Sequence, residues 1–158
     1  ERPHLRGAIG SAAFDAEGVA TRDNEIVAGG VLQSYLLGSY SARKLGLVTN
    51  GHAGGAHNVV VSGGNGGFDS LLARMGKGLV VTELMGQGVN GVTGDYSRGA
   101  VGFWVEEGAI AHPVEEVTIA GNLRDMYRSI VAVGSDVDVR GNVRTGSILI
   151  DEMTIAGE

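Results

Sequence analysis

Short apolar runs separated by glycines are the main pattern along the chain. Valine, isoleucine and leucine dominate these runs, and glycine or polar turns interrupt them, which is typical of strands in a β-rich fold. The segments that we expect to be strands are 25–28, 31–35, 59–61, 78–84, 100–105, 109–119, 136–140, 147–150 and 153–155. Two hairpins follow from this pattern, one around Gly29-Gly30, where both positions suit a positive φ, and one around 106–108.

Burial of three of these strands is also predicted from the pattern. Segments 59–61 and 78–84 are almost continuously apolar, so we expect 59–61 to be a buried strand and 78–84 to be covered on both faces. Segment 136–140 alternates valine with charged residues, which indicates a half-buried edge strand.

Three short helices complete the expected fold. The first covers 39–45 and is closed by Gly46, and the second covers 68–75 with Asp69 or Ser70 as its cap. The third begins after Asn122, a good N-cap residue. We therefore expect a mainly β (α+β) fold with antiparallel sheets and about three short helices, and we see no domain boundary.

Composition narrows the class of protein. Glycine supplies 28 of 158 residues, concentrated in 51–67 and 86–102, while hydrophobic residues make up 43%, which is compatible with a packed globule. The net charge of −6 argues against nucleic acid as a main partner. The absence of cysteine excludes disulfides and thiolate metal sites and fits the cytoplasm. No apolar run is long enough to span a membrane.

Gly86, Gly88 and Gly91 match the G-x-G-x-x-G pattern of dinucleotide-binding loops after an expected strand. The dinucleotide interpretation needs a helix after the third glycine, but residues 92–99 have no helical period. We interpret the segment as a bulged loop.

His52 and His57 flank Ala-Gly-Gly-Ala, and two nearby imidazoles suit a divalent metal. The spacing is not that of a zinc-binding helix, and no glutamate is adjacent. This favours hydrogen-bonded or peptide-contacting loop histidines over a metal site. Asp95 and Arg98 lie between Gly94 and Gly99, where they either form an ion pair that fixes a turn or line a cleft; the first interpretation is favoured.

Several long segments carry a resemblance to a known family. They are 39–47, 51–55, 78–89, 93–100, 102–106, 119–123 and 155–157. Together they resemble the C-terminal part of the PmbA (TldE) type of the TldD/PmbA family, also known as "modulator of DNA gyrase".

The resemblance implies that residues 1–158 are the single C-terminal domain of a longer protein whose N-terminal part is absent. It also implies that the longer protein is the non-catalytic, metal-free subunit of a heterodimeric cytoplasmic metallopeptidase that acts on flexible peptides. The TldD-like partner subunit is expected to hold a zinc-type divalent metal through a His-Glu-x-x-x-His helix and a later cysteine. Neither nucleic acid nor a membrane is implied, and a homodimer of the chain alone stays open.

One site position follows from the same resemblance, and four more are chosen from the glycine-framed loops. Thr145 stands where the partner type has its cysteine ligand, and we expect no catalytic residue or metal in this chain. We expect His52, His57, Asp95 and Arg98 to line the peptide cleft, because glycine-framed loops carry them. The alternative is a non-enzymatic β-rich domain that binds proteins or peptides or associates with itself.

Overall fold

The computed structural model describes residues 1–64 and 66–157, so Asn65 of the glycine-rich segment 51–67 lies outside the described residues. The chain divides into two compact units. Unit 1 comprises Glu1–Ser62 and Asp138–Thr145, and unit 2 comprises Gly63–Val137 and Gly146–Glu158. Nothing in the composition of the chain marks this division.

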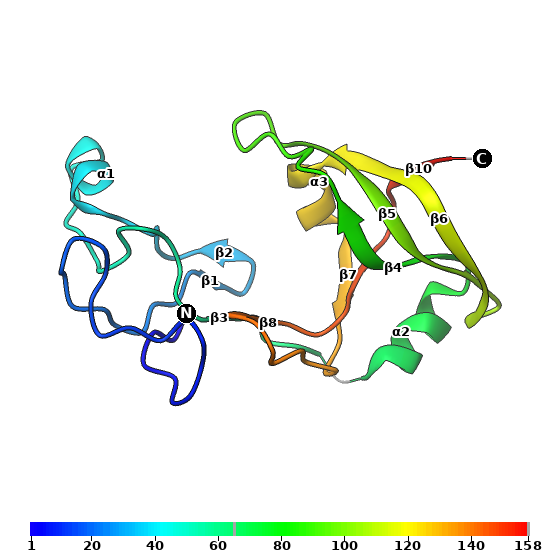
Figure 1. Cartoon of the computed structure of the whole chain (residues 1–158), viewed down its shortest axis with the longest axis horizontal. Helices are drawn as coiled ribbons and strands as arrows, with labels where there is room; N and C mark the ends of the chain where they lie inside the picture. The colour runs from blue at the N-terminus through cyan, green and yellow to red at the C-terminus, as the bar shows by residue number, and fades with distance from the viewer. Residues whose placement is uncertain (65, 158) are drawn as a thin grey trace. The chain divides into compact units, whose positions relative to one another are not determined.

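A four-stranded antiparallel sheet forms the main part of unit 2 (Figure 1). Its strand order is β10 (Thr154–Ala156), β6 (Ala109–Asn122), β5 (Asp95–Glu106) and β4 (Gly78–Met85). Ala100, Val117 and Ile119 form the buried centre of the unit, because alternate positions of β5 and β6 face the same side of the sheet.

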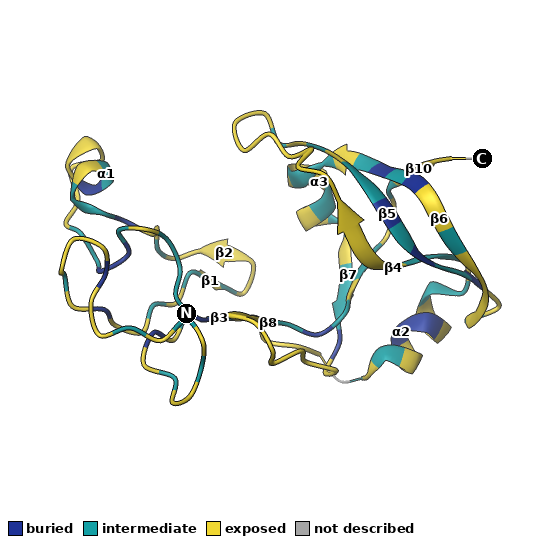
Figure 2. Cartoon of the chain, in the orientation of Figure 1, coloured by how far each residue is buried: buried dark blue, intermediate teal, exposed yellow. Residues whose placement is uncertain are grey.

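The hairpin between β5 and β6 confirms the predicted turn at 106–108. Glu107 and Gly108 both have positive φ, at 53° and 76°, as a two-residue primed turn requires. The expectation that strand 78–84 is covered on both faces is wrong. β4 is the last strand of its sheet, and its residues from Val81 onward are exposed (Figure 2).

Two helices belong to unit 2. Helix α2 (Phe68–Met75) ends at Gly76 as predicted, but Gly67 is its N-cap and neither Asp69 nor Ser70 caps it. Helix α3 (Leu123–Arg128) begins as predicted, with the Asn122 side chain accepting a hydrogen bond from the backbone N–H of Arg124. Strands β7 (Ile130–Val133) and β9 (Ile148–Ile150) of the same unit pair antiparallel.

Unit 1 contains little regular structure. It has the predicted hairpin of β1 (Val27–Ala28) and β2 (Val31–Leu32), helix α1 (Ser39–Lys44), and the parallel pair β3 (Val59–Val60) and β8 (Val143–Arg144). Strand β3 is predicted as buried, but Val60 is exposed because β3 has a single partner strand among the described residues.

The predicted edge strand 136–140 does not form. Within it only Asp138 makes a β-bridge, with Thr145, and the acidic side chains of the segment bind other side chains. Asp136 accepts from Ser147, and Asp138 pairs with Arg140. The fold class is nevertheless confirmed, since the described chain is mostly antiparallel β-sheet with three short helices. None of the helices in residues 1–64 and 66–157 has the length and apolar content that a membrane span requires.

Candidate functional site

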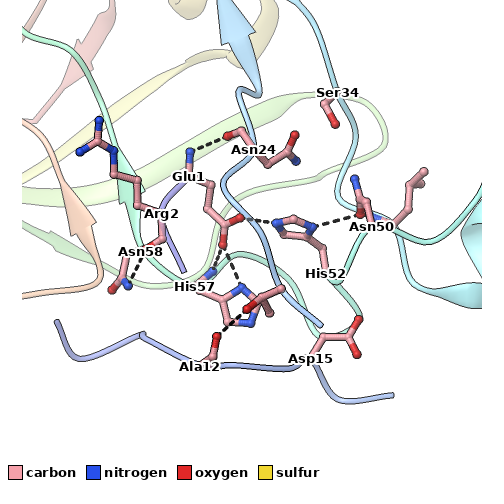
Figure 3. A network of polar contacts seen from close by, with 12 residues as sticks. Glu1, Arg2, Ala12, Asp15, Asn24, Ser34, Asn50, His52, His57 and Asn58 are labelled. Atoms are coloured by element: carbon pink, nitrogen blue, oxygen red, sulfur yellow. Dashed lines mark hydrogen bonds and ion pairs between the residues drawn. The ribbon is translucent and has the colours of Figure 1, made fainter. Parts of the chain in front are cut away.

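The Glu1 carboxylate lies between two imidazole rings inside unit 1 (Figure 3). One carboxylate oxygen contacts Nε2 of His52. The other accepts hydrogen bonds from the backbone N–H of His57, at 2.6 Å, and contacts Nδ1 of the same residue at 2.9 Å. The side chains of Glu1 and His52 have no exposed surface, and that of His57 is 13% exposed. The two histidines and the glutamate therefore form one buried polar cluster.

Two glycines bring the histidines together. Gly54 and Gly55 have φ of +99° and +107°, a backbone conformation that residues with a Cβ rarely adopt. The chain reverses there, and the two imidazole centroids come to 5.8 Å. Asp15 fixes this loop further, because its buried carboxylate accepts the backbone N–H of Ala53 at 2.9 Å.

The surroundings of Glu1 and those of Asp15 both favour the ionised form of the carboxylate. Burial opposes ionisation of Glu1, but its contacts with the His52 ring and with the backbone N–H and ring of His57 outweigh it, so the pKa of Glu1 is lowered. The same balance lowers the pKa of Asp15, where burial opposes the shift and the backbone N–H groups of Ala53, Val19 and Glu17 outweigh it.

In the part of the chain that the structure describes, one group of three histidine, cysteine or acidic residues has all its ligand atoms within 4.8 Å of one another. This group consists of Glu1, His52 and His57. Two imidazoles and one carboxylate are a common zinc ligand set. The donors therefore suit a divalent cation. A catalytic metal also needs an open position for water and substrate, whereas the Glu1 and His52 side chains are fully buried and the His57 side chain is 13% exposed.

Asp95 and Arg98 lie on β5 in unit 2 and bind different groups. The Asp95 carboxylate accepts from the hydroxyl of Thr93 at 2.6 Å. The Arg98 guanidinium lies 3.4–3.5 Å from the carbonyl oxygens of Leu84 and Met85 on β4. The expected ion pair between them is wrong, and each residue instead holds its own turn or strand.

Thr145 lies at the end of β8 in unit 1. It is half-buried, and its carbonyl oxygen accepts the backbone N–H of Asp138 at 3.0 Å. The four residues expected to line a cleft thus divide between the units: His52 and His57 lie together in unit 1, and Asp95 and Arg98 lie in unit 2. Their contact with peptide stays a prediction.

The Gly86–Gly91 segment is a loop before β5, and no helix follows it. Gly88 lies against β5, where an added Cβ would be 1.7 Å from the carbonyl oxygen of Ser97. The structure therefore excludes the dinucleotide interpretation and confirms the loop.

A large apolar groove in unit 2 is a feature that the sequence patterns missed. Its volume is about 830 Å³, and β4, α2 and the segment around β9 line it. Leu72, Leu79, Leu84, Leu149 and Met153 are among its lining residues. Glu1 was also missed, because 51 positions separate it from His52 and no motif connects them.

Comparison with known proteins places the chain in a family. Residues 1–157 match the family described as "PmbA/TldA metallopeptidase C-terminal domain". Metalloprotease PmbA of Escherichia coli O157:H7 is 58% identical over 158 residues, which cover 100% of this chain and 35% of that protein. A Thermotoga maritima crystal structure described as a modulator of a DNA gyrase superposes with a TM-score of 0.87 at 38% identity, covering 98% of this chain and 37% of that one.

The chain therefore belongs to the PmbA/TldD family of metallopeptidases, and the matching family region is a C-terminal domain. It spans about a third of the length of the curated PmbA relatives that it matches. The family also includes TldD proteins: a TldD homologue of Haemophilus influenzae is 27% identical over 173 residues, covering 94% of this chain and 36% of that protein.

Proposed function

We propose that residues 1–158 form one C-terminal domain of the non-catalytic subunit of a heterodimeric, cytoplasmic TldD/PmbA-type metallopeptidase. In this proposal a TldD-like subunit holds the zinc-type catalytic metal. This chain contributes part of the wall of the chamber that binds flexible peptides. Its membership of the family and its relatives named metalloproteases support peptidase chemistry at the level of the family.

The residues of this chain support placing catalysis in the partner. Thr145 stands at the position where we expect a cysteine ligand in the partner, and a hydroxyl is a much weaker zinc ligand than a thiolate. The Glu1 and His52 side chains are fully buried, which disfavours direct contact of this cluster with a substrate. The metal of the partner would polarise the scissile carbonyl and activate a water molecule.

The observation that carries the proposal is the exposed strand β4 beside the apolar groove. β4 ends its sheet, and its residues from Gly78 to Leu84 also line the groove. An extended peptide that adds to a strand edge forms main-chain hydrogen bonds, and every second side chain then faces a neighbouring pocket. This mode tolerates many sequences, as flexible peptide substrates require.

Arg98 supports the same surface. Its guanidinium contacts the carbonyl oxygens of Leu84 and Met85 and so holds the end of β4 in place. Within the proposal Asp95 and Arg98 lie at the border of the peptide site, and His52 and His57 remain candidate contacts that lie in the other unit.

The test is a groove variant in the complete protein mixed with its TldD-like partner. Leu84→Arg puts a charge on a groove residue, whereas Val92→Arg puts the same charge on a loop residue that is 97% exposed. We expect Leu84→Arg to raise the KM for an unfolded peptide about tenfold or more while heterodimer formation is kept, since a buried charge costs more than one factor of ten in binding. Val92→Arg should not change KM.

Equal KM values for the two variants would contradict a peptide site at this groove. Loss of self-association by Leu84→Arg without any effect on cleavage would instead favour the alternative, a non-enzymatic self-associating domain.

A further inference from the structure

Unit 1 has an unusually polar interior for its size. It contains about 70 residues, a size at which a hydrophobic core alone gives little stability and small folds add disulfides or a structural metal. Among the described residues of unit 1, the buried apolar side chains are those of Pro3, Leu37 and Ala42, whereas Asp15, Thr21, His52 and Asn58 are buried and polar. Because the sequence has no cysteine, disulfides cannot stabilise this unit.

The proton positions on His52 follow from its neighbour Asn50 (Figure 3). The Asn50 side-chain oxygen accepts the backbone N–H of Leu37 at 2.9 Å, and its amide nitrogen donates to the carbonyl of Tyr35 at 2.7 Å. These two bonds identify the Asn50 atom that faces Nδ1 of His52, at 3.0 Å, as an oxygen. Nδ1 must therefore carry the hydrogen and donate it.

This assignment leaves an unsatisfied arrangement at the other ring nitrogen. In a neutral imidazole with its hydrogen on Nδ1, Nε2 carries a lone pair. That lone pair points at an oxygen of the Glu1 carboxylate in a fully buried environment. Two acceptors in contact repel unless a positive charge lies between them.

Three features favour a metal ion over a proton as that positive charge. His57 brings a second imidazole nitrogen to the same carboxylate, at 2.9 Å, whereas a single shared proton would need only His52. An imidazole that donates its second N–H to a side-chain oxygen, as His52 does to Asn50, is the usual arrangement of a metal-binding histidine. The three ligand atoms already lie within 4.8 Å of one another.

We propose that Glu1, His52 and His57 bind one divalent cation of the zinc type, which stabilises unit 1. The ligand atoms are Nε2 of His52, Nδ1 of His57 and a carboxylate oxygen of Glu1. Ligands at the usual zinc distances of about 2.0–2.2 Å lie roughly 3.3–3.5 Å apart, so the contacts of Glu1 with the rings must open slightly when the ion binds. The site is closed to substrate and has a structural role, and it does not depend on the function proposed above.

The experiment is a metal titration of the whole chain. After treatment with a chelator, the chain is titrated with Zn²⁺ alone in competition with a chromophoric chelator, and the bound zinc is measured by mass spectrometry. We expect one Zn²⁺ per chain, and at 100 times the Kd a rise in melting temperature of about 5–10 °C. Co²⁺ in place of zinc should give visible absorption bands typical of nitrogen and oxygen ligands, and His52→Gln should abolish them.

Matched histidine variants locate the ion. His52→Gln and His57→Gln should each weaken zinc binding about 30-fold or more. His112→Gln, at an exposed residue of β6 in unit 2, and His4→Gln, at an exposed residue of unit 1, should leave binding unchanged. A chain with one glycine added before Glu1 should bind equally, which excludes the terminal amine as the ligand.

The wild-type titration decides the proposal even if a variant fails to fold. A chain that folds and retains no Zn²⁺ or Co²⁺ at micromolar concentration overturns it, and the positive charge between Glu1 and His52 is then a proton. Binding that His112→Gln weakens as much as His52→Gln also overturns it.

Discussion

Gly88 is a position in unit 2 at which a single added methyl group would meet the backbone of another strand. An ideal Cβ on Gly88 would lie 1.7 Å from the carbonyl oxygen of Ser97 and 2.9 Å from its carbonyl carbon. Both atoms belong to the backbone of β5, so no side chain can turn aside. The backbone N–H of Ser97 also donates to the carbonyl of Gly88 at 2.7 Å, which holds the two segments together.

The cost of Gly88→Ala follows from this geometry. The loop must move about 1.3 Å for the Cβ to reach the 3.0 Å below which such contacts do not occur. Overpacking of this kind costs about 1–3 kcal/mol, and the lost hydrogen bond costs about 0.5–1.5 kcal/mol. We expect Gly88→Ala to lower the free energy of unfolding by about 2–4 kcal/mol.

Gly91 provides the matched control within the same glycine pattern. A Cβ there meets no atom within 4 Å, and its φ is not positive, so Gly91→Ala should be neutral or stabilise the fold by up to about 1 kcal/mol through the unfolded state. Gly86 has a φ of +76° in open space, so Gly86→Ala should cost an intermediate amount of about 1–2 kcal/mol.

Urea denaturation followed by the fluorescence of Trp104, the single tryptophan, measures all three variants. Trp104 lies on β5, the strand that Gly88 contacts, so it reports the relevant unit. If Gly88→Ala and Gly91→Ala unfold within about 0.5 kcal/mol of each other, the close approach of Gly88 to Ser97 is not what requires glycine there, and the reasoning fails.

Two further predictions concern buried polar groups. Asn58 is fully buried, and its side chain accepts from the N–H of Gly10 and donates to the carbonyl of Arg2; Asn58→Ala leaves both unpaired and should cost about 2–4 kcal/mol, measured by thermal melting of the whole chain. The hydrogen bond from the Ser147 hydroxyl lowers the pKa of Asp136 and burial raises it. The hydrogen bond is the larger effect, so the pKa of Asp136 is lowered. The ionised Asp136 side chain therefore stabilises the fold fully above its unfolded pKa of about 3.9. This stabilisation is lost as the pH falls through the folded value, so the gap in urea midpoint between wild type and Asp136→Asn should be constant from pH 7 to about pH 5 and shrink below pH 4.

Local sequence signals predicted the secondary structure well where one residue type forces a conformation. The Gly29-Gly30 turn, the end of α2 at Gly76 and the cap at Asn122 are all observed, because a positive φ or an unpaired backbone N–H restricts the residue that fits. Burial was harder to predict. Strand β4 has the continuous apolar pattern of a covered strand, yet its outer half is exposed because it ends its sheet.

The buried cluster could be predicted only in part. The spacing of His52 and His57 around two glycines pointed to paired imidazoles, and the structure places them together. Their carboxylate partner comes from Glu1, 51 and 56 positions away, and contacts over such a distance depend on the tertiary fold. The groove beside β4 combines residues from 68 to 155 and has no local signal for the same reason.

The most direct test of the account is the cleavage of an unfolded peptide by the complete protein that contains this chain, with and without a TldD-type partner. We predict no cleavage by this protein alone, even when it is supplied with Zn²⁺, and cleavage when the partner is added, with activity lost when the partner's metal-binding histidines are replaced. Cleavage by this protein alone would contradict its assignment as the non-catalytic subunit.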